Sequence, residues 1–186
     1  MGAGPSASGP RRTVRRVQTP SSLDGFTFDY LGFDGNDLGL SDYQETWDLQ
    51  RAVHARVVAG EIGPQVLYVQ HPPVYTAGLR TEPHERPFDG TPVIDVDLGG
   101  KITYHGPGQL VGYPILYLPD YGLGASDYMH RLEELLALAL ADYGIVTHRR
   151  EGIIGVWVGE NKIAALGVRV RGQVTYHGWA LNVAPD

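Results

Sequence analysis

The sequence predicts an α/β (α+β) fold, a mixed β-sheet flanked by helices that pack on one face of it. Short runs of β-branched and aromatic residues recur between glycine- and proline-containing turns along most of the 186 residues, a pattern typical of strands. Two longer segments carry apolar residues at helical spacing. The chain is 42% hydrophobic and 19% charged, a composition that fits one globular domain with a buried core.

The N-terminal residues 1–22 are rich in Gly, Pro, Ser and Arg and show no periodicity. We predict that they are disordered and that the domain spans residues 23–186. The acid-free, Arg-containing composition would also suit an organellar transit peptide, although the segment lacks the apolar core of a secretory signal. We therefore expect a cytoplasmic protein.

The first half of the domain opens with a strand over residues 26–33, where aromatic residues alternate with small or polar ones. Ser41, with Gln44 three residues later, forms a capping-box pattern that predicts the start of a helix. Gly60 is expected to end that helix. The apolar run at 65–70 predicts a short buried strand, which His71-Pro72-Pro73 terminates.

The middle of the chain alternates strands and polar loops. Short strands are expected at 74–76 and 93–96, with a polar loop at 78–90 between them. Residues 110–118 also predict a strand. Pro114 interrupts this strand, and because proline cannot donate a ladder hydrogen bond, we expect an edge position or a bulge there.

The last third predicts one helix and an antiparallel meander. Ser126 is the expected cap of the helix, and Gly144 its terminating residue. Three strands follow at 153–158, 162–170 and 173–183, joined by short turns.

The stretch 99–109 concentrates four glycines, a proline, Lys101, Thr103 and His105. Glycine permits close approach of the backbone to a ligand, and histidine titrates near neutral pH. We interpret the stretch as a rigid, ligand-facing loop and strand. The alternative for His105 is a ring satisfied by backbone hydrogen bonds in a turn, and for Lys101 a solvated charge at a strand end.

Lys162 is the second candidate for chemistry. It follows a Gly-Glu-Asn turn and begins the apolar run 163–167. A lysine at the mouth of a buried strand can be partly desolvated, which lowers its pKa and makes it a usable acid or base. An exposed turn lysine is the alternative. Tyr176-His177-Gly178 echoes Tyr104-His105-Gly106 but is too short to count as a repeat.

Several classes of site and partner are disfavoured. The chain has no cysteine and no His-Glu-x-x-His or phosphate-loop motif, so we expect no metal and no cofactor. The net charge of −6 gives no sign of nucleic-acid binding. The longest apolar run, 135–141, is too short to cross a bilayer, so we expect no membrane partner.

Four stretches together resemble the lipoyl(octanoyl) transferase family. The most specific is Gly99-Gly100-x-x-Thr103-Tyr104-His105-Gly106-Pro107-Gly108-Gln109, followed by Tyr113-Pro114. The other three appear in the family's order: His71-Pro72-Pro73-Val74-Tyr75-Thr76-x-Gly78, Lys162-Ile163-Ala164-Ala165-Leu166-Gly167-Val168-Arg169 and His177-Gly178-Trp179-Ala180-Leu181-Asn182.

This resemblance implies a fold related to biotin and lipoate protein ligases. It also implies transfer of an octanoyl group from octanoyl-acyl carrier protein to a lysine of lipoyl domains, those of 2-oxoacid dehydrogenase E2 subunits and of the glycine cleavage H protein. In that family a cysteine thiolate first takes the acyl group as a thioester. The resemblance makes Lys162 the residue that lowers the thiol pKa and shuttles protons.

The resemblance also implies an acyl-binding pocket formed by three segments. Its residues would be Leu98, Gly99, Gly100, Lys101, Ile102, Thr103, Tyr104, His105, Ala165, Leu166, Gly167, Gly178, Trp179 and Ala180.

Two departures qualify this expectation. Leu98 stands where the family has an arginine before the two glycines. The family's cysteine lies in a Pro-Cys-Gly element downstream of the strand that ends at Asn182, and these 186 residues contain none. We therefore expect an octanoyltransferase truncated before its nucleophile. The alternatives are an inactive fragment or pseudoenzyme that binds acyl chains or lipoyl domains, and an ATP-dependent ligase, which the missing phosphate motif disfavours.

Overall fold

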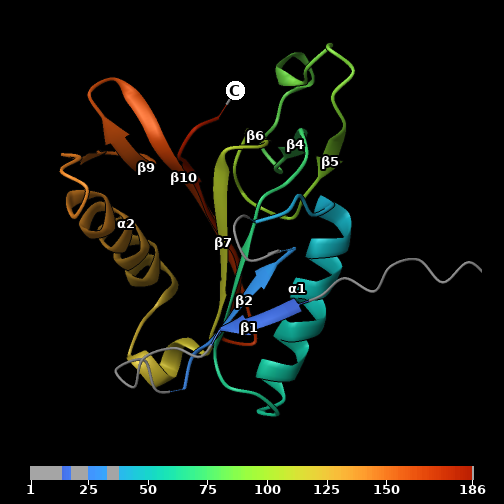
Figure 1. Ribbon diagram of the computed structural model, residues 1–186, viewed down its shortest axis with the longest axis vertical. Helices are drawn as coiled ribbons and strands as arrows, with labels where there is room; N and C mark the ends of the chain where they lie inside the picture. The colour runs from blue at the N-terminus through green and yellow to red at the C-terminus, as the bar shows by residue number, and fades with distance from the viewer. Residues whose placement is uncertain (1–13, 18–24, 33–37, 186) are drawn as a thin grey trace, which may run out of the picture.

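The computed structural model describes residues 14–17, 25–32 and 38–185, and most of its strands belong to one mixed sheet (Figure 1). Within this main sheet only β2 and β3 pair in parallel, so the predicted mixed sheet is confirmed. Its strands, in spatial order, are β1 (Val14–Val17), β2 (Thr27–Leu31), β3 (Gln65–Val69), β7 (Gln109–Ile115), β11 (Val174–Asn182), β10 (Asn161–Arg171), β9 (Ile153–Val158) and β8 (His148–Arg150).

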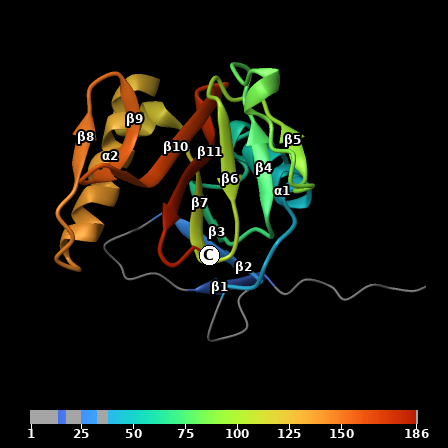
Figure 2. The same ribbon diagram turned by 90° about the horizontal axis from the view of Figure 1, so that it is seen from above.

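A small sheet lies beside the main sheet (Figure 2). It has the order β5 (Val93–Asp95), β4 (Val74–Ala77) and β6 (Ile102–His105). β4 pairs in parallel with β5 and antiparallel with β6. The glycine-rich stretch therefore enters the small sheet through β6 and the main sheet through β7, which links the two sheets covalently.

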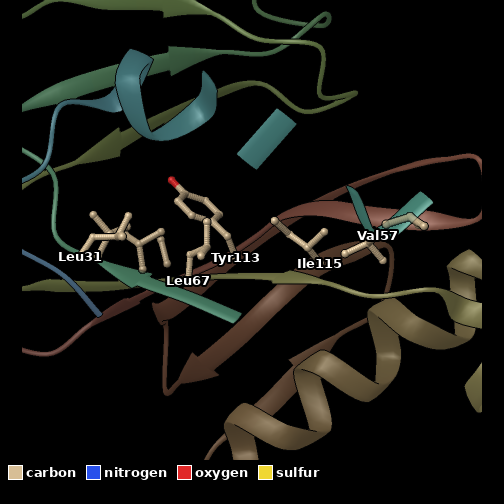
Figure 3. Close-up of a cluster of buried hydrophobic side chains, with 9 residues drawn as sticks. Leu31, Val57, Leu67, Tyr113 and Ile115 are labelled. Carbon is tan, nitrogen blue, oxygen red and sulfur yellow. The ribbon is translucent and has the colours of Figure 1, made fainter. Parts of the chain in front are cut away.

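The two long helices, α1 (Tyr43–Val58) and α2 (Ala125–Ala141), cover opposite faces of the main sheet (Figure 1). The predicted packing on one face is therefore wrong. Along β3, Leu67 belongs to the core cluster that includes Val57 of α1 (Figure 3), whereas Tyr68 packs on the cluster under α2. A strand that is apolar on both faces gives no sequence signal for which face each helix covers.

Both helices begin one or two residues from the predicted caps. Asp42 caps α1, because its carboxylate accepts a hydrogen bond of 3.0 Å from the Glu45 amide. Ser41, the predicted cap, is fully buried. The residue before α2 is Gly124, which makes no side-chain cap, so Ser126 lies inside the helix.

Pro114 lies in the middle of the main sheet rather than at an edge, since β7 pairs with β3 and with β11. Its position is tolerated because the β7–β11 pairing ends at Gly112 and Trp179. Beyond it, the Thr175 hydroxyl donates to the Pro114 carbonyl (2.8 Å) and accepts from the Leu116 amide (3.1 Å). The Thr175 side chain thus satisfies the Pro114 carbonyl and the Leu116 amide where β7 no longer pairs with β11.

The predicted meander is confirmed as the antiparallel strands β9, β10 and β11. Of the residues 1–22 predicted to be disordered, the structure describes Val14–Val17, which pair antiparallel with β2 as β1. The rest of that segment lies outside the described residues. Within the described part of the chain, no helix is long and apolar enough to cross a membrane.

Candidate active site

A cavity of about 610 Å³ lies between the small sheet and the main sheet. Residues of β6 and of the segment before it line one side, and residues of β10 and β11 line the other. Tyr43 of α1 and Val111 and Tyr113 of β7 also line it. The cavity therefore depends on several segments that are distant in the sequence.

The structure brings almost all of the predicted site residues to this cavity. Those that line it are Leu98, Gly99, Gly100, Lys101, Ile102, Thr103, His105, Lys162, Ala165, Leu166, Gly167, Gly178, Trp179 and Ala180.

Tyr104 is the exception. Its side chain is on the other face of β6, next to Tyr75, with ring centroids 5.2 Å apart. Alternation along a strand explains this, because the neighbours Thr103 and His105 face the cavity side.

Lys162 reaches the cavity because β10 is irregular. Lys162 and Ala165 are three residues apart, a spacing that places two side chains on opposite faces of a regular strand. The pairing with β9 shifts between Lys162 and Ala164, so one residue of β10 is extra. The shift allows both residues to line the same cavity.

The Lys162 ammonium lies near the open end of the cavity. Its Nζ donates to the Ile154 carbonyl at 3.2 Å and lies 5.0 Å from the centre of the Trp157 ring. Partial burial lowers the pKa of Lys162 below its usual value. A lysine in this setting can exchange a proton at lower pH than a fully solvated one.

His105 is buried in the cavity wall. Its Nδ1 lies 2.8 Å from Gln109 Oε1, and because an amide oxygen only accepts, Nδ1 carries the hydrogen. Nε2 lies 3.4 Å from the Thr76 hydroxyl. Burial lowers the pKa of His105 to about 4, so the ring is neutral at pH 7. We conclude that His105 acts as a neutral hydrogen-bonding group rather than as a cation.

A chain of side-chain amides connects His105 to the lysine strand. Gln109 Nε2 donates to Asn182 Oδ1 at 2.9 Å, and Asn182 Nδ2 donates to the Lys162 carbonyl at 3.3 Å. The glutamine and asparagine of the sequence motifs therefore hold β7, β11 and β10 in register behind the cavity.

A second buried histidine supports the same wall. His71 Nδ1 donates to the Ser41 carbonyl at 2.7 Å, so Nε2 accepts from the Tyr113 hydroxyl at 2.8 Å. Tyr43 packs on both His71 and His105, with ring centroids 5.0 and 5.8 Å away. The rings form one aromatic cluster at the base of the cavity.

Sequence reasoning missed several lining residues, among them Tyr43, Tyr113, Met129 and His177. Tyr43 and Met129 are indistinguishable from core residues in the sequence, because only the packing of α1 and α2 decides what they face. Tyr113 had a signal, since it stands in the motif that follows the glycine-rich stretch. His177 had a signal, since it stands beside a glycine as His105 does. Among the described residues, no cluster of three or more His, Asp or Glu side chains could hold a metal ion.

The chain matches the family model "Lipoyl protein ligase A/B catalytic domain" over residues 42–186. It is 52% identical over 166 residues to an octanoyltransferase of Pseudarthrobacter chlorophenolicus, covering 84% of this chain and 73% of the relative. It is 53% identical to an octanoyltransferase of Salinispora arenicola, covering 80% and 72%. It is 48% identical to an octanoyltransferase of Cutibacterium acnes, covering 87% of this chain and 61% of that relative.

Solved structures share the fold at low sequence identity. A putative lipoate protein ligase from T. acidophilum superposes with a TM-score of 0.59 at 14% identity. A lipoate-protein ligase A bound with ATP superposes with a TM-score of 0.60 at 15% identity. These matches cover 75% and 74% of this chain, and the chain spans 65% and 62% of the two solved chains.

Proposed function

Because this chain belongs to the octanoyltransferases of the lipoyl protein ligase A/B family, a family of acyltransferase enzymes, we propose that it transfers an octanoyl group from octanoyl-acyl carrier protein to a lysine of lipoyl domains. The proposed acceptors are the lipoyl domains of 2-oxoacid dehydrogenase E2 subunits and the glycine cleavage H protein, and we place the reaction in the cytoplasm. The observation that carries this proposal is the convergence of three motif segments on one cavity.

The chemistry of the cavity suits an acyl chain. Aliphatic residues from both sides line it, including Val96, Leu98, Ile102 and Ala165. Burying a methylene gains about 0.8 kcal/mol, so a fully buried octanoyl tail would gain roughly 5 kcal/mol. The residues that line the cavity include no acidic side chain, so the interior does not repel an anionic carboxyl or thioester oxygen.

Lys162 is the proposed proton-transfer group. Its lowered pKa raises the fraction of neutral amine near pH 8. In the thioester route, this amine would accept the proton of a thiol and return it to the departing group. The 186 residues contain no cysteine, so the thiol in this route has to come from outside them.

A second candidate function, acyl binding without transfer, is favoured by one observation: the cavity is present although the chain has no cysteine. Both candidates predict binding of an octanoyl group, and they differ only in whether the group reaches a lipoyl-domain lysine.

The test incubates the chain with octanoyl-acyl carrier protein and an apo lipoyl domain, and measures the mass of the lipoyl domain. A parallel titration with octanoate follows the tryptophan fluorescence, with Trp179→Phe as a control, because Trp179 is the tryptophan of the three that lines the cavity. An octanoylated domain supports the proposed transfer, and fluorescence change without transfer supports the binding function. A chain that does neither contradicts both. Transfer from free octanoate only with ATP would indicate a ligase instead.

A further inference from the structure

The two ends of the acyl cavity differ in exposure. Lys162 and the half-exposed Ile153 and Ile154 line one end. At the other end, Val168 of β10 pairs with His177 of β11, whose side chain is only 2% exposed. The lining is therefore more exposed near Lys162 than near His177, and we call the His177 end, five to six residues further along β10, the closed end.

Leu98 lies across the closed end. A Cβ added to Gly167 would be 3.0 Å from Leu98 Cδ1, so the leucine side chain lies directly on the bare backbone of β10. On its other side, Leu98 packs on the buried cluster that contains Tyr43 and Val96. The side chain thus connects the two walls of the cavity.

The backbone of Leu98 is held from the small-sheet side. Its carbonyl accepts a hydrogen bond of 2.8 Å from the Leu79 amide. A Cβ added to Gly78 would lie 2.9 Å from the same carbonyl oxygen and 2.4 Å from that of Gly100. The segment therefore sits tightly against Gly78, with no room to move back.

The residue before Leu98 ties the segment to the main sheet. Asp97 Oδ1 accepts from His177 Nε2 at 3.0 Å, and Oδ2 accepts from the Tyr176 hydroxyl at 2.6 Å. Arg169 Nη1 donates to the Asp97 carbonyl at 2.9 Å, and its Nε lies 3.8 Å from Oδ2. Three side chains from β10 and β11 thus converge on one carboxylate.

His177 itself is rigidly placed. Its backbone is left-handed, with φ of 57°, and its amide donates to the fully buried Gln50 at 2.9 Å. A left-handed backbone in a residue other than glycine persists where surrounding contacts enforce it. His177, which donates to Asp97, is therefore held as firmly as the strands of the main sheet.

We propose that Leu98 is the residue that limits the length of the acyl chain, and that Asp97 is a positioning residue that holds it in place. The inference rests on the proposed function, because it assumes an acyl occupant whose reactive end lies near Lys162 and whose tail points toward Leu98. Truncating Leu98 extends the cavity at its closed end. Weakening the hydrogen bonds of Asp97 lets the Leu98 side chain shift but leaves it at the closed end.

The experiment measures binding of saturated fatty acids from hexanoate to tetradecanoate to four versions of the full chain by titration calorimetry. These are the wild type, Leu98→Ala, Asp97→Asn and Leu138→Ala, a matched truncation of an exposed leucine on α2. We expect Leu98→Ala to move the tightest ligand about two methylenes longer, with affinity rising about fourfold for each methylene accommodated.

Asp97→Asn should broaden the preference while keeping the same optimum, and Leu138→Ala should match the wild type. A merely structural role of Asp97 would lower the affinity for every chain length by the same factor, and that result overturns its assignment. If Leu98→Ala prefers the same acyl-chain length as the wild type, Leu98 does not limit chain length. The proposed function would be unaffected by that result. If the wild type binds no fatty acid of any length, the proposed function fails as well.

Discussion

At the scale of single residues, burial decides the chemistry of the cavity. His105 and Lys162 both line it, and in both the charged form is disfavoured by desolvation. His105 is deeply buried and Lys162 only partly so. The same physical effect thus keeps the histidine neutral and leaves the lysine able to titrate.

The first prediction concerns acid stability. The pKa of His105 in the folded protein, about 4, is below the ordinary histidine value of 6.5, so the unfolded chain binds the proton first. The contribution of His105 is present above pH 6.5 and is lost as the pH falls toward 4, by up to about 3 kcal/mol. The pKa of the neighbouring His177 is also lowered, mainly by burial, which adds to the loss.

Urea unfolding at pH 7 and pH 5 measures this slope. His105→Gln retains a partner for Gln109 but cannot titrate, so its stability should fall less between the two pH values than that of the wild type. Equal slopes in the two proteins would show that the pKa of His105 is the same in the folded and unfolded chains.

The second prediction uses the fact that Lys101 and Lys162 are the only lysines in the chain. After reductive methylation with ¹³C, the protein should give two lysine methyl signals, which Lys101→Met assigns. We expect the Lys162 signal to titrate below the usual lysine pKa because of partial burial. A midpoint at or above 10.5 would remove the support for Lys162 as the proton-transfer group.

At the scale of elements, two local features set the positions of the site residues. The register shift in β10 turns Lys162 to the cavity side. Gly155 of β9 has φ of 146°, and a Cβ there would lie 3.0 Å from both Lys162 Cε and the Ala164 carbonyl. The bare backbone of β9 thus provides the channel in which the lysine stem lies.

The third prediction follows from that contact. Gly155→Ala should destabilise the protein by about 2–3 kcal/mol, because a left-handed backbone and a steric clash add. Gly159→Ala is the matched control, since Gly159 has φ of 53° but open space at its Cβ, and should cost only about 1 kcal/mol. Chemical denaturation compares them, and equal losses would mean that the lysine stem does not need the glycine.

The fourth prediction tests the helix starts. Asp42→Ala removes the side-chain cap of α1 and should cost about 1 kcal/mol. Ser126→Ala replaces an exposed residue inside α2 and should change stability by less than about 0.5 kcal/mol. Thermal unfolding distinguishes the two, and the reverse order would restore Ser126 as the cap.

At the scale of the whole molecule, the main sheet is a shared wall between two cores. Ile115 belongs to the cluster under α1 and Leu136 to the cluster under α2, and both are almost fully buried. Because β7 and β11 contribute to both clusters and also line the cavity, the sheet that stabilises the molecule is the scaffold of the candidate site.

The fifth prediction concerns the independence of the two cores. Ile115→Val should cost about 1 kcal/mol and Leu136→Ala about 2–5 kcal/mol. Because the residues lie in clusters on opposite faces, the double variant should lose the sum to within about 0.5 kcal/mol. A large coupling energy in urea unfolding would indicate that the two side chains share one core.

Much of the fold could be predicted from the sequence, because local patterns report local structure. The meander of β9 to β11 follows from alternation and short turns, and the helix ends follow from Gly60 and Gly144, which both adopt positive φ. Most residues of the expected pocket also proved to share one cavity. Tyr104 did not, since alternation along β6 turns it away.

The amino-acid sequence alone is enough to identify both long helices, most of the strands and the motifs that they carry, but not β1 or β8. Contacts between distant segments set which face of the sheet each helix covers, place Pro114 in the middle of the sheet, and connect Asp97, beside Leu98, to β10 and β11. The difference is one of separation along the chain, because turn chemistry and periodicity depend on residues a few positions apart. The cavity depends on contacts such as Leu98 with Gly167, which exist only once both sheets have formed.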